Sequence, residues 1–111
     1  MTCRHEAGAA NMAEAYGKLT GNPGVCFVTR GPGACHASVG VHIAHQDSTP
    51  MIMLVGQVPR SFVGREAFQE VDVEQMFGWT TKLAAQIDDP AHIPEIVSHA
   101  CLLYTSPSPR D

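Results

Sequence analysis

One acidic side chain, Glu6, stands at the start of a predicted helix, where a carboxylate could share a proton with a bound group. It follows Arg4 and His5, and the alanine and glycine residues after it leave room for a ligand. A carboxylate near a helix N-terminus is also stabilised by the helix dipole. The local sequence therefore leaves two interpretations open: a chemical group, or a first-turn glutamate that only stabilises a core helix.

A second candidate feature is the Gly-Pro-Gly turn at residues 31–33. The apolar run at 24–29 before it is typical of a strand buried on both faces, and residues 34–45 after it are predicted to be helical. A strand, a glycine turn and a helix N-terminus present open backbone amides at the carboxyl edge of a parallel sheet, where ligands bind. The alternative is an ordinary tight turn between a strand and a helix.

The chain also has six histidines and four cysteines. His42 and His45 are three residues apart on the helix predicted at 34–45, so they could share a face. No acidic or cysteine partner completes a ligand set, and we therefore predict no metal site. Without CxxC spacing, the cysteines are expected to be small buried hydrophobes in a reducing, cytoplasmic compartment: Cys3, Cys26, Cys35 and Cys101.

The helix that must hold Glu6 is predicted over residues 4–21. Gly21 is suited to the position after a helix, and Pro23 prevents continuation. Apolar residues at helical spacing predict the face that packs on the rest of the domain: Ala9, Met12, Ala13, Tyr16 and Leu19.

The remaining elements alternate between strand and helix. Residues 51–55 predict a second buried strand, residues 60–66 a surface loop and residues 80–87 a weaker strand. A short helix at 73–77 is expected to begin at the N-cap Asp72 and stop at Gly78. A last helix follows Asp89 and Pro90, with its apolar face at Ile93, Ile96 or Val97, and Ala100.

Alternating strands and helices predict an α/β fold, a three-layer arrangement of a mostly parallel sheet with helices on both faces. The 111 residues suffice for one modest domain, which we assign to residues 1–103. Residues 104–111 are rich in serine and proline, and we expect a non-native or disordered tail. The net charge of −4 argues against nucleic acid or an anionic membrane as partner. No apolar run spans a bilayer.

Five short motifs occur in order along the chain. Each alone is weak, but their order and spacing together resemble the pyrimidine-binding domain of thiamine diphosphate enzymes, above all acetolactate synthase and its relatives. The resemblance covers about residues 4–100. Its motifs are RHE at 4–6 with the Gly-Ala-Ala and Tyr-Gly helix after it, TRGPGA at 29–34, DSTPM at 47–51, GQVP at 56–59 and AFQE at 67–70.

The resemblance implies a role for Glu6. In the family, a glutamate hydrogen-bonds the aminopyrimidine ring nitrogen of the cofactor and favours the tautomer that removes the thiazolium proton. Small and apolar neighbours would raise the pKa of such a carboxyl group, which suits proton sharing. The cofactor itself carries the difficult chemistry.

By the same resemblance, the turn at 31–33 lies against the pyrimidine and the 68–69 pair approaches the substrate. His36 stands where the family often has Asn, and it can also donate a hydrogen bond. Phe68 has core packing as its alternative, and Gln57 is a weaker assignment. The implied cofactor contacts, besides Glu6, are Pro32, Gly33, His36 and Gln69, and the substrate side is Phe68 and Gln69.

The Gly-Asp-Gly and Asn motif that binds the diphosphate and Mg²⁺ in this family does not occur in these 111 residues. The strands that precede the RHE motif in relatives are also missing. We therefore expect a fragment that is inactive alone, from an enzyme that decarboxylates and ligates 2-keto acids such as pyruvate. The full-length enzyme would be a homodimer or homotetramer, and FAD is possible in it.

Several alternatives stay open. The same domain occurs in benzoylformate decarboxylase-like, oxalyl-CoA decarboxylase-like and sulfoacetaldehyde acetyltransferase-like enzymes. The chain could instead be a non-catalytic α/β binding module. A downstream Gly-Asp-Gly motif would separate the enzymes from the module.

Overall fold

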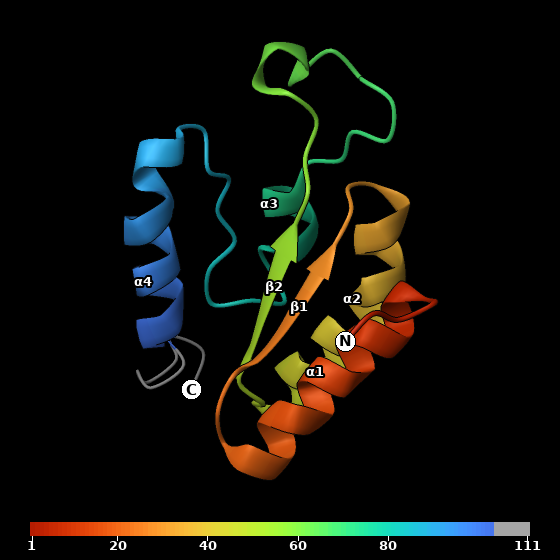
Figure 1. Ribbon diagram of the computed structural model, residues 1–111, viewed down its shortest axis with the longest axis vertical. Coiled ribbons are helices and arrows are strands. Elements are labelled where there is room, and N and C mark those ends of the chain that lie inside the picture. The colour runs from red at the N-terminus through yellow and green to blue at the C-terminus, as the bar shows by residue number, and fades with distance from the viewer. Residues whose placement is uncertain (104–111) are drawn as a thin grey trace.

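A computed structural model describes residues 1–103, and the tail predicted at 104–111 lies outside them. β1 and β2 pair in parallel, with Cys26 opposite Met53, so the predicted α/β class with a parallel sheet is confirmed. The elements in chain order are α1 (Glu6–Thr20), β1 (Gly24–Val28), α2 (Pro32–Asp47), β2 (Met51–Val55), a 3₁₀ helix (Arg60–Phe62), α3 (Val73–Phe77), a second 3₁₀ helix (Pro90–His92) and α4 (Ile93–Leu103) (Figure 1).

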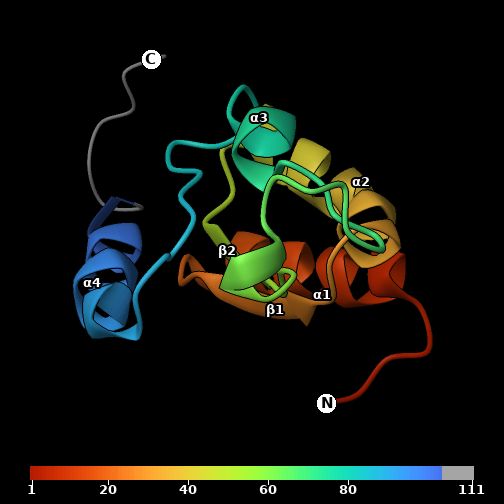
Figure 2. The ribbon, with the colours of Figure 1, turned by 90° about the horizontal axis from the view of Figure 1, so that it is seen from above.

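The helices divide between the two sides of the sheet. α1, α2 and α3 lie together on one side, and α4 stands apart from them beside β2 (Figure 2). Cys26 packs with α1 and α2, while Phe77 of α3 packs with α2 and with Met51, Met53 and Val55. α4 faces the other side of the sheet across a groove of about 570 Å³. The core therefore lies between the sheet and the first three helices.

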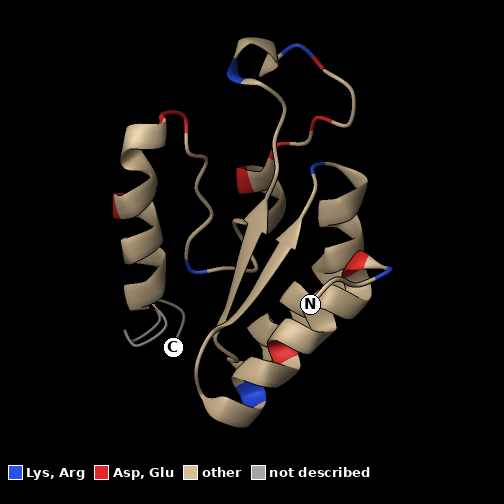
Figure 3. Ribbon diagram, viewed as in Figure 1, with Lys and Arg blue, Asp and Glu red and all other residues tan. Residues whose placement is uncertain are grey.

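The strands are not buried on both faces, as their apolar sequences predicted. Val25 is 54% exposed and Phe27 is 75% exposed. Side chains alternate across a strand, so these two point away from the face that α1 and α2 cover. Neither strand carries a charged residue (Figure 3). The exposed Val25 and Phe27 therefore form an apolar patch on the open side.

The packing face of α1 also differs from the prediction. The helix buries Ala10, Ala13, Glu14 and Gly17, whereas Met12, Tyr16 and Leu19 are exposed. The reason is close contact with α2: a Cβ at Gly40 would lie 2.6 Å from the Cβ of Ala10. Only small residues fit such a crossing, so residue size rather than hydrophobicity selects the buried face.

The predicted helix ends are confirmed. Gly21 has φ 73° and its N–H donates to the carbonyl of Gly17. The side chain of Asp72 accepts from the backbone N–H of Gln75 at 3.1 Å. That of Asp89 accepts from Ala91 at 2.9 Å and caps the 3₁₀ helix Pro90–His92, which leads into α4. The 34–45 helix is longer than predicted, because Pro32 occupies its first turn and Asp47 ends it.

The strand predicted at 80–87 is wrong. The hydroxyl groups of Thr80 and Thr81 donate to the carbonyl of Phe77, at 3.3 and 2.7 Å. The backbone N–H of Gln86 donates to the carboxylate of Glu74 at 2.7 Å. The segment is therefore bonded to α3 rather than paired with the sheet, and local hydrogen bonds have outweighed its weak strand pattern.

The cysteines only partly match expectation. All four are free, but Cys26 alone is buried, whereas Cys35 and Cys101 are exposed. None of the helices within residues 1–103 is long and apolar enough to cross a membrane.

We expect the isolated chain to self-associate through the exposed apolar side of the sheet at Val25 and Phe27. Uncovered strands and apolar patches promote contact between copies. Phe27→Thr should shift the chain toward monomer in sizing chromatography with light scattering. Leu19→Gln is the matched control, since Leu19 is 86% exposed on α1 rather than on the sheet. A sharp wild-type monomer would contradict this prediction.

Candidate functional site

Glu6 begins α1, as the sequence predicted. His5 is the N-cap, and its Nδ1 accepts a hydrogen bond from the backbone N–H of Ala7 at 3.1 Å. This cap places the glutamate in the first turn, where the free amides of the helix favour a negative charge. The site's central carboxylate is therefore fixed by the helix start.

A second helix supplies the partner of Glu6. Nδ1 of His36, on α2, lies 3.1 Å from Oε2 of the glutamate. The rings of His5 and His36 also contact, with centroids 4.7 Å apart. The Glu6 side chain remains 34% exposed, so its carboxylate is accessible from outside the protein. The structure thus brings together two residues that the sequence assigned to the cofactor site.

The expected rise in the pKa of Glu6 is wrong. Its own backbone N–H and the hydrogen bond with His36 both stabilise the carboxylate and lower its pKa. Burial acts in the opposite direction but is the weaker influence, because the side chain is partly exposed. In this structure Glu6 is therefore a charged acceptor.

The Gly-Pro-Gly turn lies directly between β1 and α2. Gly31 has φ 58°, a left-handed conformation that suits glycine. Pro32 occupies the first turn of α2. A Cβ at Gly33 would lie 2.7 Å from Cγ2 of Thr29, so this glycine is required by packing within the turn.

The 67–70 motif packs against this turn. A Cβ at Gly31 would lie 2.6 Å from the carbonyl oxygen of Gln69, and Nε of Arg30 donates to the carbonyl of Phe68 at 3.1 Å. Phe68 is 78% exposed, so it does not pack in the core that the described residues form. The structure therefore joins the predicted substrate-side pair to Pro32 and Gly33.

Glu70 holds the loop that carries this pair, a role that the sequence analysis missed. Its carboxylate accepts from the backbone N–H of Gly64 at 2.7 Å and of Ala67 at 3.0 Å. These hydrogen bonds lower the pKa of Glu70. Gln57 stabilises the C-terminal end of the loop, because its Nε2 donates a hydrogen bond to the carbonyl of Val71 at 3.1 Å. A single glutamate between a glutamine and a valine gives no distinctive sequence signal for such a role.

We expect acid to release this loop. The folded-state pKa of Glu70 lies below its unfolded value, so its stabilising effect is present above the unfolded pKa and is lost as pH falls through the folded pKa. Amide hydrogen exchange at Gly64 and Ala67 should accelerate at low pH relative to the rest of the chain. Glu70→Gln should remove most of this pH dependence, whereas Glu66→Gln, on an exposed side chain in the same loop, should keep it. Equal profiles in all three proteins would contradict the assignment.

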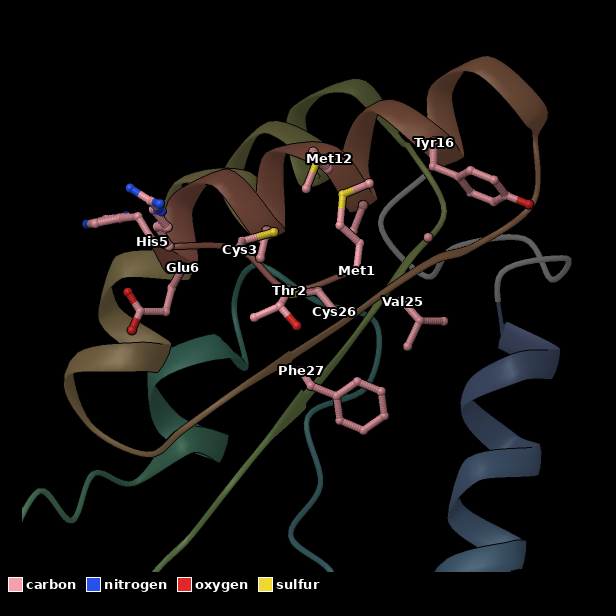
Figure 4. A pocket seen from close by; sticks show the side chains of 14 residues that line it. Met1, Thr2, Cys3, His5, Glu6, Met12, Tyr16, Val25, Cys26 and Phe27 are labelled. Carbon is pink, nitrogen blue, oxygen red and sulfur yellow. The ribbon is translucent and has the colours of Figure 1, made fainter.

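A groove of about 770 Å³ runs from Glu6 along α1 and β1. Figure 4 shows the Glu6 carboxylate at one end and Tyr16 at the other, with Met12, Val25 and Phe27 between them. A charged acceptor at the end of an apolar wall suits a flat, nitrogen-containing ring whose polar edge meets the carboxylate. The groove therefore offers one charged hydrogen-bond acceptor to such a ring.

Comparison with known families identifies the domain. Residues 1–76 match the family described as "Thiamine pyrophosphate enzyme, N-terminal TPP binding domain". The chain belongs to this family. The matched region contains α1, both strands, α2 and most of α3, and hence Glu6, His36 and the 67–70 motif.

Curated relatives of this thiamine pyrophosphate-binding domain are acetolactate synthase large subunits. The protein of Pyropia yezoensis is 45% identical over 100 residues, 87% of this chain and 16% of its own length. That of Parasynechococcus marenigrum is 42% identical over 109 residues, 96% of this chain and 17% of its own. A probable large subunit of Methanococcus aeolicus is 45% identical over 97 residues, 87% of this chain and 16% of its own. The chain therefore spans about one sixth of these relatives.

Proposed function

We propose that this chain supplies the pyrimidine-binding part of the cofactor site in an acetolactate synthase-like enzyme. The observation that carries the proposal is the accessible carboxylate of Glu6 at the N-terminus of α1, held by a side chain from a second helix. When bound, thiamine diphosphate would supply a carbon nucleophile that attacks the carbonyl group of a 2-keto acid.

Glu6 would share a proton with the cofactor's ring nitrogen through a hydrogen bond. Because its pKa is lowered in this structure, the carboxylate is charged, so it would accept the hydrogen bond once that proton is on the ring nitrogen. His36 already bonds Oε2, so it would either orient the carboxylate or compete for it. The remaining oxygen faces no such competition from His36.

The turn and the 67–70 motif would complete this half of the site. We assign Pro32 and Gly33 to the face of the pyrimidine, and Gln69 to the cofactor or the substrate. Phe68, exposed beside them, would contact the substrate. Their support is the close approach of Gln69 to Gly31, which places the two motifs next to each other.

The activity of the whole enzyme is part of the proposal. It would decarboxylate and ligate 2-keto acids such as pyruvate, as a homodimer or homotetramer in the cytoplasm. Mg²⁺ and the diphosphate, and FAD if present, would be bound by other parts of the full-length protein, so the chain alone would be inactive. The relatives named above favour this reaction over the related decarboxylases and acetyltransferases.

A chimera tests the proposal. Residues 4–100 of this chain would replace the corresponding segment of an acetolactate synthase large subunit, and turnover of pyruvate to acetolactate would be measured with thiamine diphosphate and Mg²⁺. We expect activity in the chimera. A folded chimera that binds no cofactor would contradict the assignment.

A further inference from the structure

Three side chains with metal-ligating atoms converge at the N-terminus of α1: His5, Glu6 and His36. Their candidate ligand atoms all lie within 4.8 Å of one another. The oxygen of Glu6 and the nitrogen of His36 are already 3.1 Å apart. Nothing in the sequence indicated this cluster, because His36 lies 30 residues from Glu6 and the fold alone brings them together.

We propose that His5, Glu6 and His36 form a binding site for a divalent transition-metal ion such as Zn²⁺. Two imidazole nitrogens and one carboxylate, with an open fourth position for water, are a ligand set that Zn²⁺ takes readily. Ligand atoms around a tetrahedral zinc ion stand roughly 3.3 Å apart. The Glu6–His36 pair already has this spacing. Mg²⁺ and Ca²⁺ prefer oxygen ligands and should bind far more weakly.

The geometry allows the third ligand to move into place. His5 and His36 are exposed, so rotation of the side chains can close the remaining distances. Ligation by His5 would cost the N-cap hydrogen bond, however, because its Nδ1 accepts from the backbone N–H of Ala7. A neutral imidazole has one acceptor nitrogen, so ligation by His5 removes the cap hydrogen bond. We therefore expect a dissociation constant in the micromolar range rather than the nanomolar range.

An occupied metal site has a consequence for the carboxylate. An ion bound to Glu6 would take the acceptor that the cofactor's ring nitrogen needs, so the metal and the cofactor would exclude one another. This consequence rests on the proposed function, whereas the metal site itself does not. A zinc titration without cofactor and the chimera assay without zinc can therefore fail independently.

The test is isothermal titration of ZnCl₂ into the 111-residue chain. Thiols also bind zinc, so the protein carries Cys3→Ser, Cys35→Ser and Cys101→Ser. We expect one ion per chain. Co²⁺ in place of Zn²⁺ should give the visible absorption of a four-coordinate nitrogen and oxygen site without a thiolate charge-transfer band.

Matched variants assign the ligands. His36→Asn should weaken binding by at least about 10–100-fold, since even the loss of an outer hydrogen-bond partner costs a metal site that much. His5→Asn should do the same while keeping an N-cap acceptor, so α1 stays capped. His42→Asn, an exposed histidine on α2 outside the cluster, should bind zinc as before.

Two results would overturn the proposal. One is the absence of saturable binding by the chain with the three Cys→Ser changes, since any uptake by the unmodified chain would then belong to its thiols. The other is equal zinc affinity in His36→Asn and His42→Asn. Circular dichroism of each variant confirms that lost binding reflects a lost ligand rather than a lost fold.

Discussion

Glu6→Gln in the chimera should slow exchange of the cofactor's thiazolium C2 proton with solvent deuterium by about 10²–10⁴-fold, the usual contribution of acid–base assistance. Glutamine keeps the size of the side chain and an acceptor oxygen, so the start of α1 is nearly preserved. It cannot share a proton with the ring nitrogen. Exchange at saturating cofactor isolates this step from cofactor binding.

The control for this prediction is Glu95→Gln. Glu95 is an exposed glutamate in the first turn of α4, so the same change is made at another helix start. Its exchange rate should equal that of the unmodified chimera. Equal rates in Glu6→Gln and Glu95→Gln would remove Glu6 from the mechanism and leave it a helix-capping charge.

The local elements could be predicted from the sequence because their signals are local. Gly21, Asp72 and Asp89 act on backbone groups within a few residues, so residue type and position suffice. The second strand was predicted at its observed bounds for the same reason, since a continuous apolar run between turn signals has few other outcomes.

Packing could not be predicted in the same way. Which face of α1 is buried depends on the distance to α2, and the small residues at that crossing carry weak hydrophobic signals. The exposure of Phe27 depends on what covers the second face of the sheet, which the apolar strand sequence does not encode.

The candidate site was predictable only through its motifs. Their order led to Glu6, Gln69 and the turn before α2, but spacing could not show that Gln69 packs on Gly31. The lowered pKa of Glu6 was missed because it arises from the residue's own backbone N–H and from His36, and the contact with His36 depends on the fold. A contact between residues on two different helices produces no periodic pattern in the sequence.

Gly40→Ala should destabilise the domain by about 1–2 kcal/mol. The added Cβ would lie 2.6 Å from the Cβ of Ala10 and 2.7 Å from its backbone carbonyl carbon. A backbone atom cannot rotate away, so α1 and α2 must separate, and overpacking of this kind costs about 1–3 kcal/mol. The better helix propensity of alanine offsets about 0.5–1 kcal/mol of that cost. Urea unfolding followed by circular dichroism measures the difference, in a Phe27→Thr background that limits association.

Gly8→Ala is the matched control, because it makes the same substitution within α1 at a position where an added Cβ meets nothing within 4 Å. There the propensity gain acts alone, and the free energy of unfolding should rise by about 0.5–1 kcal/mol. The two variants should therefore differ in sign. If Gly40→Ala is as stable as Gly8→Ala, the helices do not cross closely in solution. The pairing of Glu6 with His36, which that crossing positions, would then lose its structural basis.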